Sequence, residues 1–445
     1  MTKEITLKDI EAFEADLEKR PAAKLARNAV TKNGIANAAM NYDRVSAPHT
    51  FSIEVNAGEV CNQKQSGRCW MFASLNVMRL NVMKKLKLKN VELSQSYPLF
   101  FDKLERSNHF LENIIATADE DLDSRNVWFL LQDPVGDGGQ WDMFRSIIEK
   151  YGIVPKDVYP ETAVSEGTRE LNDYLTKKLR GFAMELRNAK ADGKSLRALR
   201  QMKGEMMNTV YRMLVTALGK PPVSFNWNVK DKDDKIVTVK NMTPKKFFDK
   251  YIGWNLDEMV TVINAPTKDK PYHRTYTVQF LGCVEEARYP VKYLNLPMDE
   301  LKRLTIEQLK AGEAVWFGSD VGQFSDRKGG YLIEDAVDAA GLFDTDFPMN
   351  KAERLDYCES LMTHAMVITG VELDGRGRAL YWKVENSWGE DVGFKGFYTM
   401  SDKWFSEFAY QILLNKKYLT QEERREFDSK PIVLKPWDPM GSLAV

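Results

Sequence analysis

A cysteine at the start of an apolar helical run is the clearest candidate for nucleophilic chemistry in this sequence. Residues 61–74 read CNQKQSGRCWMFAS, and the turn at Gly67 leads directly into the apolar stretch after Cys69. The first helical turn has unpaired N–H groups and the positive end of the helix dipole, and both stabilise a thiolate. Gln63, on the incoming loop, is placed to donate a side-chain N–H to a carbonyl oxygen under attack. A lone cysteine is more often a small buried apolar residue, so the prediction requires a base elsewhere.

The base and a residue to orient it are found late in the chain. His364 begins an apolar, β-branched segment, and a second such segment ends in Asn386-Ser-Trp-Gly. The turn predicted at Asp374-Gly375 between them favours an antiparallel pair of strands, which brings Asn386 against the His364 ring. His364 then takes the proton of Cys69, Asn386 fixes the orientation of the imidazole, and Trp388 shields their hydrogen bond from water.

These segments resemble those of the papain-fold cysteine peptidases. Within that group, QKQSGRCW at 63–70, THAM at 363–366, ENSWG at 385–389 and WDPMG at 437–441 resemble the branch of bleomycin hydrolase and bacterial aminopeptidase C. The resemblance extends over nearly the whole chain. Secreted papain-like enzymes have a disulfide-forming cysteine where this chain has Ser66, and the mechanism does not need it.

The resemblance implies an α+β, papain-like fold of two lobes with a large, mainly helical insertion and a C-terminal arm. His364 lies 295 residues after Cys69, whereas simple papain-like enzymes have a spacing of about 130–150 residues. The predicted parts are an N-terminal helix and strap (1–55), a helical catalytic lobe with the nucleophile (56–160), the insertion (161–300), a β-rich catalytic lobe with the histidine and asparagine (301–430) and the arm (431–445). The insertion is rich in Leu and Met, and these residues are buried either in a lobe of its own or at a subunit interface.

The N-terminal segment has the pattern of a capped amphipathic helix. Thr6 and Asp9 are spaced as a capping box, and Ile10, Phe13 and Leu17 share one helical face. We expect this helix to pack across the catalytic body.

Two segments are expected to bind the substrate. The resemblance implies that Gly138 and Gly139, in the sequence DGGQW, present backbone groups to an extended peptide. Three prolines favour an extended conformation for 431–445, and its apolar residues suggest anchoring. In the resembling aminopeptidases the arm lies in the cleft with its terminal carboxylate toward the substrate's α-ammonium group. The residue here would be Val445, which extends one position past the Gly-Ser-Leu-Ala ending.

Composition limits the other functional classes. The 63 basic and 64 acidic residues nearly cancel, so no net field favours nucleic acid or an anionic membrane. Four scattered cysteines, the lack of a signal sequence and the lack of an apolar span predict a reducing, cytoplasmic location. No metal motif or phosphate loop is present, and we expect neither metal nor other cofactor. The remaining histidines have no recognisable catalytic context: His49, His109 and His273.

The favoured function is a cysteine aminopeptidase that cleaves N-terminal residues from peptides through a thioester, and the resemblance extends this to bleomycin hydrolysis and a homohexamer. One alternative is a cytoplasmic thiol endopeptidase. Endopeptidases and aminopeptidases of this kind use the same bond-breaking residues, and they differ only in whether a segment blocks one end of the cleft. The other is an interaction protein on the same scaffold that binds nucleic acid through the basic run at 177–203. A solvated helix face explains that run better, since Phe182 is its only aromatic residue.

Overall fold

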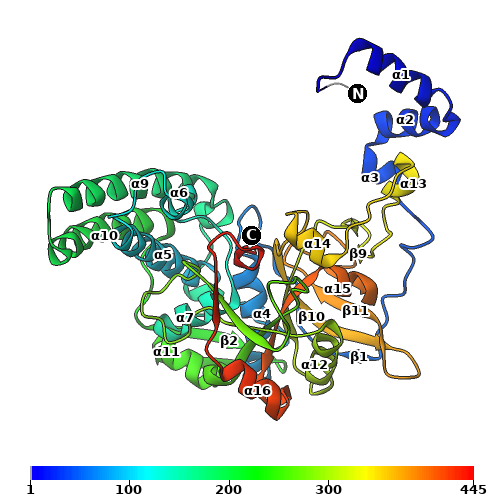
Figure 1. The fold of residues 1–445 in the computed structure, drawn as a ribbon. Helices are drawn as coiled ribbons and strands as arrows, with labels where there is room; N and C mark the ends of the chain where they lie inside the picture. The colour runs from blue at the N-terminus through cyan, green and yellow to red at the C-terminus, as the bar shows by residue number, and fades with distance from the viewer. Residues whose placement is uncertain (1–2, 445) are drawn as a thin grey trace.

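The computed structural model describes residues 3–444, and its helices and strands lie in two parts that meet along helix α4, Cys69–Leu86 (Figure 1). The other α-helices are α1 (Leu7–Leu17), α2 (Pro21–Asn33), α3 (Ile35–Ala38), α5 (Ser96–Ala116), α6 (Arg125–Gln132), α7 (Trp141–Tyr151), α8 (Ala163–Glu166), α9 (Arg169–Ala191), α10 (Leu196–Leu218), α11 (Pro244–Phe247), α12 (Met298–Lys310), α13 (Ala339–Phe343), α14 (Lys351–Asp356), α15 (Asp402–Phe408) and α16 (Gln421–Asp428).

One long sheet forms the strand part of the molecule. Within residues 3–444 it has the order β14-β5-β6-β4-β13-β7-β10-β11-β12-β9-β8, and β1 pairs with β10. Its strands are β1 (Ile53–Glu54), β4 (Met259–Ile263), β5 (Arg274–Val278), β6 (Tyr293–Asn295), β7 (Val315–Ser319), β8 (Ser325–Asp326), β9 (Tyr331–Leu332), β10 (His364–Leu373), β11 (Ala379–Glu385), β12 (Phe397–Ser401), β13 (Ala409–Asn415) and β14 (Ile432–Leu434). A separate hairpin consists of β2 (Phe225–Lys230) and β3 (Ile236–Met242).

The central strands are buried on both faces, which explains their unbroken apolar sequence. In β7 the Trp316 side chain joins the apolar core shared with α4, whereas its neighbours Val315 and Phe317 join a second core. In β10, Val367 faces the first core and Met366 the second. Successive side chains of a strand point to opposite faces, so each strand serves both cores. Helices α12 and α15 cover the second face, and α4 lies against the first.

The antiparallel pair predicted around Asp374-Gly375 is confirmed. Strand β10 pairs with β11 from Val367 opposite Glu385 to Leu373 opposite Ala379. The turn between the strands is closed by the backbone N–H of Asp374, which donates to the carbonyl of Arg378 at 2.8 Å.

The region predicted as a mainly helical insertion, 161–300, is helical only in part. Helices α8 to α10 end at Leu218, and the chain then enters the β2–β3 hairpin. Strands β4, β5 and β6 belong to the same sheet as the His364 strand. The Met259–Ile263 strand, MVTVI, is entirely buried and pairs with β13, because β-branched residues suit a sheet covered on both faces.

The apolar face of the insertion helices is buried within the chain. Helices α9 and α10 pack against each other and on α5. Leu175, Leu179, Leu186 and Val210 lose all contact with solvent. The structure therefore buries these residues inside the chain, but in the same apolar core as helices α4 and α5 and not in a separate lobe.

Basic residues of the 177–203 run are largely engaged with the neighbouring helical lobe. Arg180 donates to the carbonyls of Leu131 and Gln132, and Arg187 donates to those of Thr117 and Glu120. Two further cations, Arg200 and Lys203, pair with Glu112. These contacts are those of a structural helix face.

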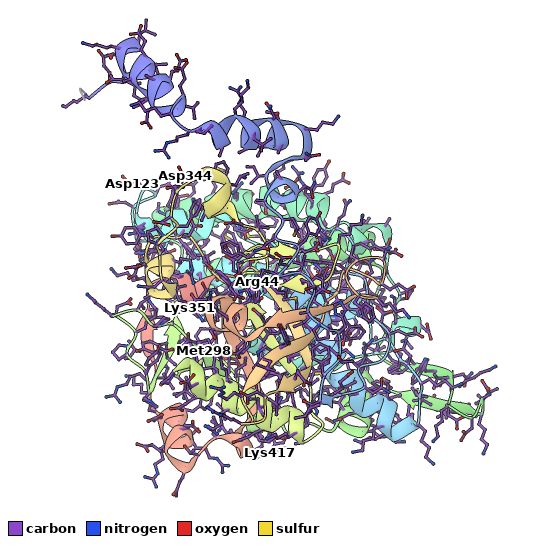
Figure 2. All side chains as sticks on the ribbon, turned by 90° about the vertical axis from the view of Figure 1, so that its right-hand side faces the viewer. Arg44, Asp123, Met298, Asp344, Lys351 and Lys417 are labelled. Carbon is purple, nitrogen blue, oxygen red and sulfur yellow. The ribbon has the colours of Figure 1, made fainter. Side chains whose placement is uncertain are left out.

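The N-terminal helices do not pack across the catalytic body, so that expectation is wrong. The capping box of α1 is present, with the backbone N–H of Asp9 donating to the Thr6 hydroxyl at 3.3 Å. However, α1, α2 and α3 have no buried residues, and they project from the body beside α13 (Figures 1 and 2). Arg20 contacts Asp344, labelled in Figure 2, at 2.5 Å. Because α1 projects from the body, its apolar face is not covered by the cores of its own chain.

None of the helices in the described part of the chain has the length and apolar character needed to cross a bilayer.

Candidate active site

Cys69 is the first residue of α4, as the sequence predicts. Its side chain is fully buried, and its sulfur accepts a hydrogen bond from the backbone N–H of Ala365 at 3.4 Å. Ala365 follows His364 at the start of β10. The nucleophile candidate from the helical part therefore lies against the first residues of the strand that carries the base candidate.

The loop before Cys69 is held by buried polar contacts. Arg68 pairs with Glu161 at 2.9 Å and donates to the Ser66 hydroxyl at 2.8 Å. The Ser66 hydroxyl in turn donates to the carbonyl of Gln63 at 2.6 Å. Ser66 thus contributes hydrogen bonds to the loop at the position where secreted relatives have a disulfide. All four cysteines of the chain are free.

His364, Asn386 and Trp388 come together as predicted. The Nε2 atom of His364 and Oδ1 of Asn386 are 2.9 Å apart. The Trp388 ring lies over the imidazole with 5.0 Å between ring centroids. Both His364 and Asn386 are buried. The indole therefore covers the hydrogen-bonded pair, the arrangement that orients a general base and keeps water from its partner.

Gln63 is tied to the turn that follows Asn386. Its backbone N–H donates to the carbonyl of Ser387 at 2.8 Å, and its Oε1 accepts from the Ser387 hydroxyl at 2.6 Å. Its Nε2 donates to the carbonyl of Ser66 at 2.7 Å. A primary amide carries two N–H donors, so one remains for a substrate oxygen. The sequence pointed to Gln63 but not to Ser387, which sets the direction of the amide.

The thiol does not have the lowered pKa that its helix position alone suggests. Burial raises the pKa of Cys69 to about 12, although the backbone N–H groups of Ala365 and Trp70 lower it. The charge of Asp137 raises it further. Burial disfavours any isolated thiolate. Ionisation of Cys69 at neutral pH therefore requires a cation formed at the same time, and an imidazolium is the group that chemistry of this type supplies.

A buried ion pair beneath the site escaped sequence analysis. Arg79 on α4 donates to Glu385 on β11 at 2.8 Å, and both side chains are 1% exposed. Asn76 donates to the same carboxylate oxygen at 2.8 Å. Burial raises the pKa of Glu385 to about 7, whereas Arg79 lowers it. Because Glu385 precedes Asn386, this pair joins the nucleophile helix to the strand that carries the orienting residue.

The C-terminal arm occupies the loop expected to bind peptides. The backbone N–H of Gly139 donates to the carbonyl of Ala444 at 3.1 Å, and the Ala444 N–H donates back at 3.4 Å. This is the pairing of one antiparallel bridge. An extended segment therefore lies along Gly139, and in this structure the segment belongs to the chain itself.

The two glycines, both predicted to present backbone groups to a peptide, have different partners within the chain. The Gly138 N–H donates to the carbonyl of Gly67 at 2.9 Å, and the Gly138 carbonyl accepts from the Arg106 guanidinium at 2.8 Å. A Cβ at Gly138, where φ is +85°, would lie 2.9 Å from the Ala444 carbonyl oxygen. A Cβ at Gly139 would meet the Trp70 ring at 2.6 Å. Gly139 alone pairs with the extended segment, while Gly138 allows its close approach.

Several anchors hold the arm along its length. Lys270, whose side chain is 2% exposed, pairs with Asp438 at 3.1 Å, and Arg125 lies 3.6 Å above the Trp437 ring. Gln140 donates to the carbonyl of Ser442 at 2.5 Å. Figure 1 shows the arm rising from α16 to the junction of the two parts. The apolar residues of the arm were predicted to anchor it, but the partners of Trp437 were not predicted, because they are far away in sequence.

The predicted carboxylate of Val445 lies outside the described residues. The histidines set aside earlier have other surroundings. His49 stacks on Phe394, His109 bonds to Glu285, and His273 bonds to Glu426 at 3.1 Å.

Comparison with known proteins gives one family over most of the chain. Residues 4–441 match the model of the peptidase C1-like family.

Individual relatives match from end to end. The chain is 50% identical to aminopeptidase C of Lactobacillus delbrueckii subsp. lactis, with 100% of this chain and 99% of that protein covered. It is 51% identical to aminopeptidase C of Streptococcus thermophilus, with 97% of each covered. A crystal structure of pepw from Lactobacillus rhamnosis HN001 superposes with a TM-score of 0.97 at 53% identity, covering 100% of both chains.

Proposed function

The chain belongs to the peptidase C1-like family, and from this premise we propose that it is a cysteine aminopeptidase in which Cys69, His364, Asn386 and Gln63 perform the chemistry. The papain-like fold and the aminopeptidase C relatives support the activity. The contacts of His364 with Asn386 and of the Cys69 sulfur with the start of β10 support the residue roles.

The reaction is acyl transfer to sulfur. His364 takes the Cys69 proton, and the sulfur forms a bond to the peptide carbonyl carbon while the carbonyl oxygen becomes negative. Gln63 and the backbone N–H of Cys69 donate to that oxygen. His364 then gives its proton to the leaving amine as the C–N bond breaks. Water, deprotonated by His364, attacks the thioester and releases the acid and the free thiol.

The arm determines which peptides reach the sulfur. The observation that carries this part of the proposal is the Gly139–Ala444 bridge, because the arm there uses the backbone groups that a longer substrate would need. An arm in this position is expected to leave room for only one or a few substrate residues before the bond that Cys69 attacks. A terminal carboxylate at Val445 would attract the free ammonium group of such a substrate. The enzyme would then release N-terminal residues and leave internal bonds uncut.

The decisive experiment compares the full chain with a variant ending at Lys435. Substrates are an aminoacyl-coumarin and an N-acetylated peptide-coumarin. We expect the full chain to require the free amine, and the truncation to gain cleavage of the blocked peptide by about 10–100-fold, the effect of one hydrogen bond to a charged group. Cys69→Ala in both backgrounds measures contaminating activity. Equal cleavage of both substrates by the full chain would instead support the endopeptidase.

We further propose a closed homo-oligomer, with six copies as the family resemblance implies. The support is the apolar face of α1, where Ile10 is 41%, Phe13 48% and Leu17 50% exposed. An amphipathic helix with its apolar face in water favours association. The region that supports oligomer formation is therefore the N-terminal helix and not the insertion, because the apolar face of the insertion is buried. The cytoplasmic location and activity on bleomycin stay predictions.

A further inference from the structure

Trp388 marks the side of the site toward which the leaving part of the substrate extends. His364 must reach the leaving amine to protonate it, so the residues after the cleaved bond lie on the His364 side. The Trp388 ring lies 5.0 Å from the His364 ring and is only partly buried. The arm lies along the opposite wall, at Gly139. The leaving portion therefore passes near the indole.

An arginine lies on that indole. The guanidinium carbon of Arg327 is 4.1 Å from the centroid of the Trp388 ring. Arg327 is in the turn between β8 and β9, and β9 pairs with β12 at the edge of the catalytic sheet. A side chain on this turn can therefore contact the same leaving portion of the substrate that passes near Trp388.

The backbone of Arg327 is fixed from two directions. Its carbonyl accepts from the Tyr398 hydroxyl at 3.1 Å and from the backbone N–H of Gly393 at 3.2 Å. Tyr398 also packs edge-on against Trp388, with 6.0 Å between the rings. The arginine is therefore held in place by the same aromatic residues that surround the His364 ring.

The charged end of Arg327 has no partner of opposite charge within residues 3–444. The side chain is exposed, and its guanidinium forms neither an ion pair nor a hydrogen bond in the described chain. The carboxylate next to it in sequence, Asp326, instead accepts from the backbone N–H of Gly329 at 2.9 Å. A planar cation stacked on an aromatic ring keeps its N–H edge free to bind a carboxylate.

We propose that Arg327 is a specificity-determining residue that binds a carboxylate on the leaving portion of the substrate. The inference rests on the proposed function, because it assumes cleavage at Cys69. The chemical class is a short peptide with a carboxylate one or two residues after the cleaved bond. That carboxylate is either the C-terminus of a dipeptide or tripeptide, or an acidic side chain.

The test measures kcat/KM on matched substrates that share one N-terminal residue. A dipeptide is compared with its C-terminal amide, and a Glu-amide with a Gln-amide, so that the two sources of the carboxylate are separated. We expect the wild type to prefer at least one carboxylate form by about threefold to tenfold, as for a partly exposed ion pair, and to lose this preference at high salt.

Arg327→Met should abolish the preference, and Lys328→Met is the matched control because it removes the neighbouring exposed cation. An aminoacyl-coumarin has no carboxylate on its leaving group, so Arg327→Met should hydrolyse it at the wild-type rate. Loss of activity on this substrate would show a structural role and overturn the proposal, as would a wild type without carboxylate preference or a preference that survives in Arg327→Met. A wild type inactive on every free-amine substrate would contradict the proposed function instead.

Discussion

The two ends of the chain carry apolar residues of similar kind but place them in opposite surroundings. In the C-terminal arm, Met440 and Ala444 are buried in the apolar core that the helices share with one face of the sheet. In the N-terminal helices, Phe13 and Leu17 stay exposed, although their helix is well capped. Sequence pattern alone does not separate the two, since both have anchors spaced for burial.

The difference lies in the available partner. The arm forms backbone hydrogen bonds with Gly139 and an ion pair with the buried Lys270. Its binding partners are therefore all in its own chain. Within residues 3–444, helix α1 has no buried residue. One end therefore serves the active site of its own chain, and the other is suited to contact a second copy. A variant that changes one end and leaves the other intact tests this difference.

The largest expected effect is on assembly. Phe13→Glu places a charge on the apolar face of α1, and burying it at an interface without a partner is costly. We expect the oligomer to dissociate, so that the molar mass measured by light scattering falls several-fold. The kcat on an aminoacyl-coumarin should change less than twofold. Glu14→Gln, at a neighbouring exposed position, is the control. A monomeric wild type at micromolar concentration would contradict the proposed role of the N-terminus.

A smaller effect is expected from one anchor of the arm. Asp438→Asn removes the arm's charge from the buried Lys270 ammonium, so the docked arm loses stability. Cleavage of an N-acetylated peptide should rise by about threefold to tenfold as the arm spends more time undocked. Asp269→Asn removes the other carboxylate on Lys270 but leaves the arm unchanged, and it should have no such effect. Equal behaviour of the two variants would show that the Lys270 pair does not hold the arm.

The smallest effect concerns the pH dependence of thiol alkylation. Burial raises the pKa of Cys69, so a variant ending at Lys435, which admits water to the cleft, should have a lower thiol pKa. The thiolate fraction then appears at lower pH, and the rate of iodoacetamide labelling should rise through its midpoint about one unit earlier than in the full chain. Cys69→Ser identifies the labelled residue. A midpoint that moves to higher pH would mean that the arm favours the thiolate.

The reacting residues were accessible from the sequence because their surroundings are local. The apolar run after Cys69 and the Asp374-Gly375 turn follow from residue order, and they place the thiol at a helix start and His364 beside Asn386. The capping box at Thr6 was predictable for the same reason. Such features depend on contacts a few residues apart, or on one tight turn between two strands.

Other features depended on residues brought together from distant parts of the chain. The strands within 259–295 were not predicted from the sequence, and their place in the sheet comes from the pairing of β4 with β13, of β6 with β4 and of β5 with β6. The raised pKa of Cys69 follows from total burial, which only the packed structure produces. The partners of Trp437 and Asp438, and the arginine on Trp388, also come from remote segments.

The sequence by itself determined which residues are chemically competent and which local elements carry them, because helix starts, turns and strand alternation are set by neighbours along the chain. Tertiary structure alone decided that the arm pairs with Gly139 and that α1 stays uncovered. The physical reason is that an apolar or charged side chain specifies a need for a partner, whereas the identity of that partner depends on which surfaces the fold brings within reach.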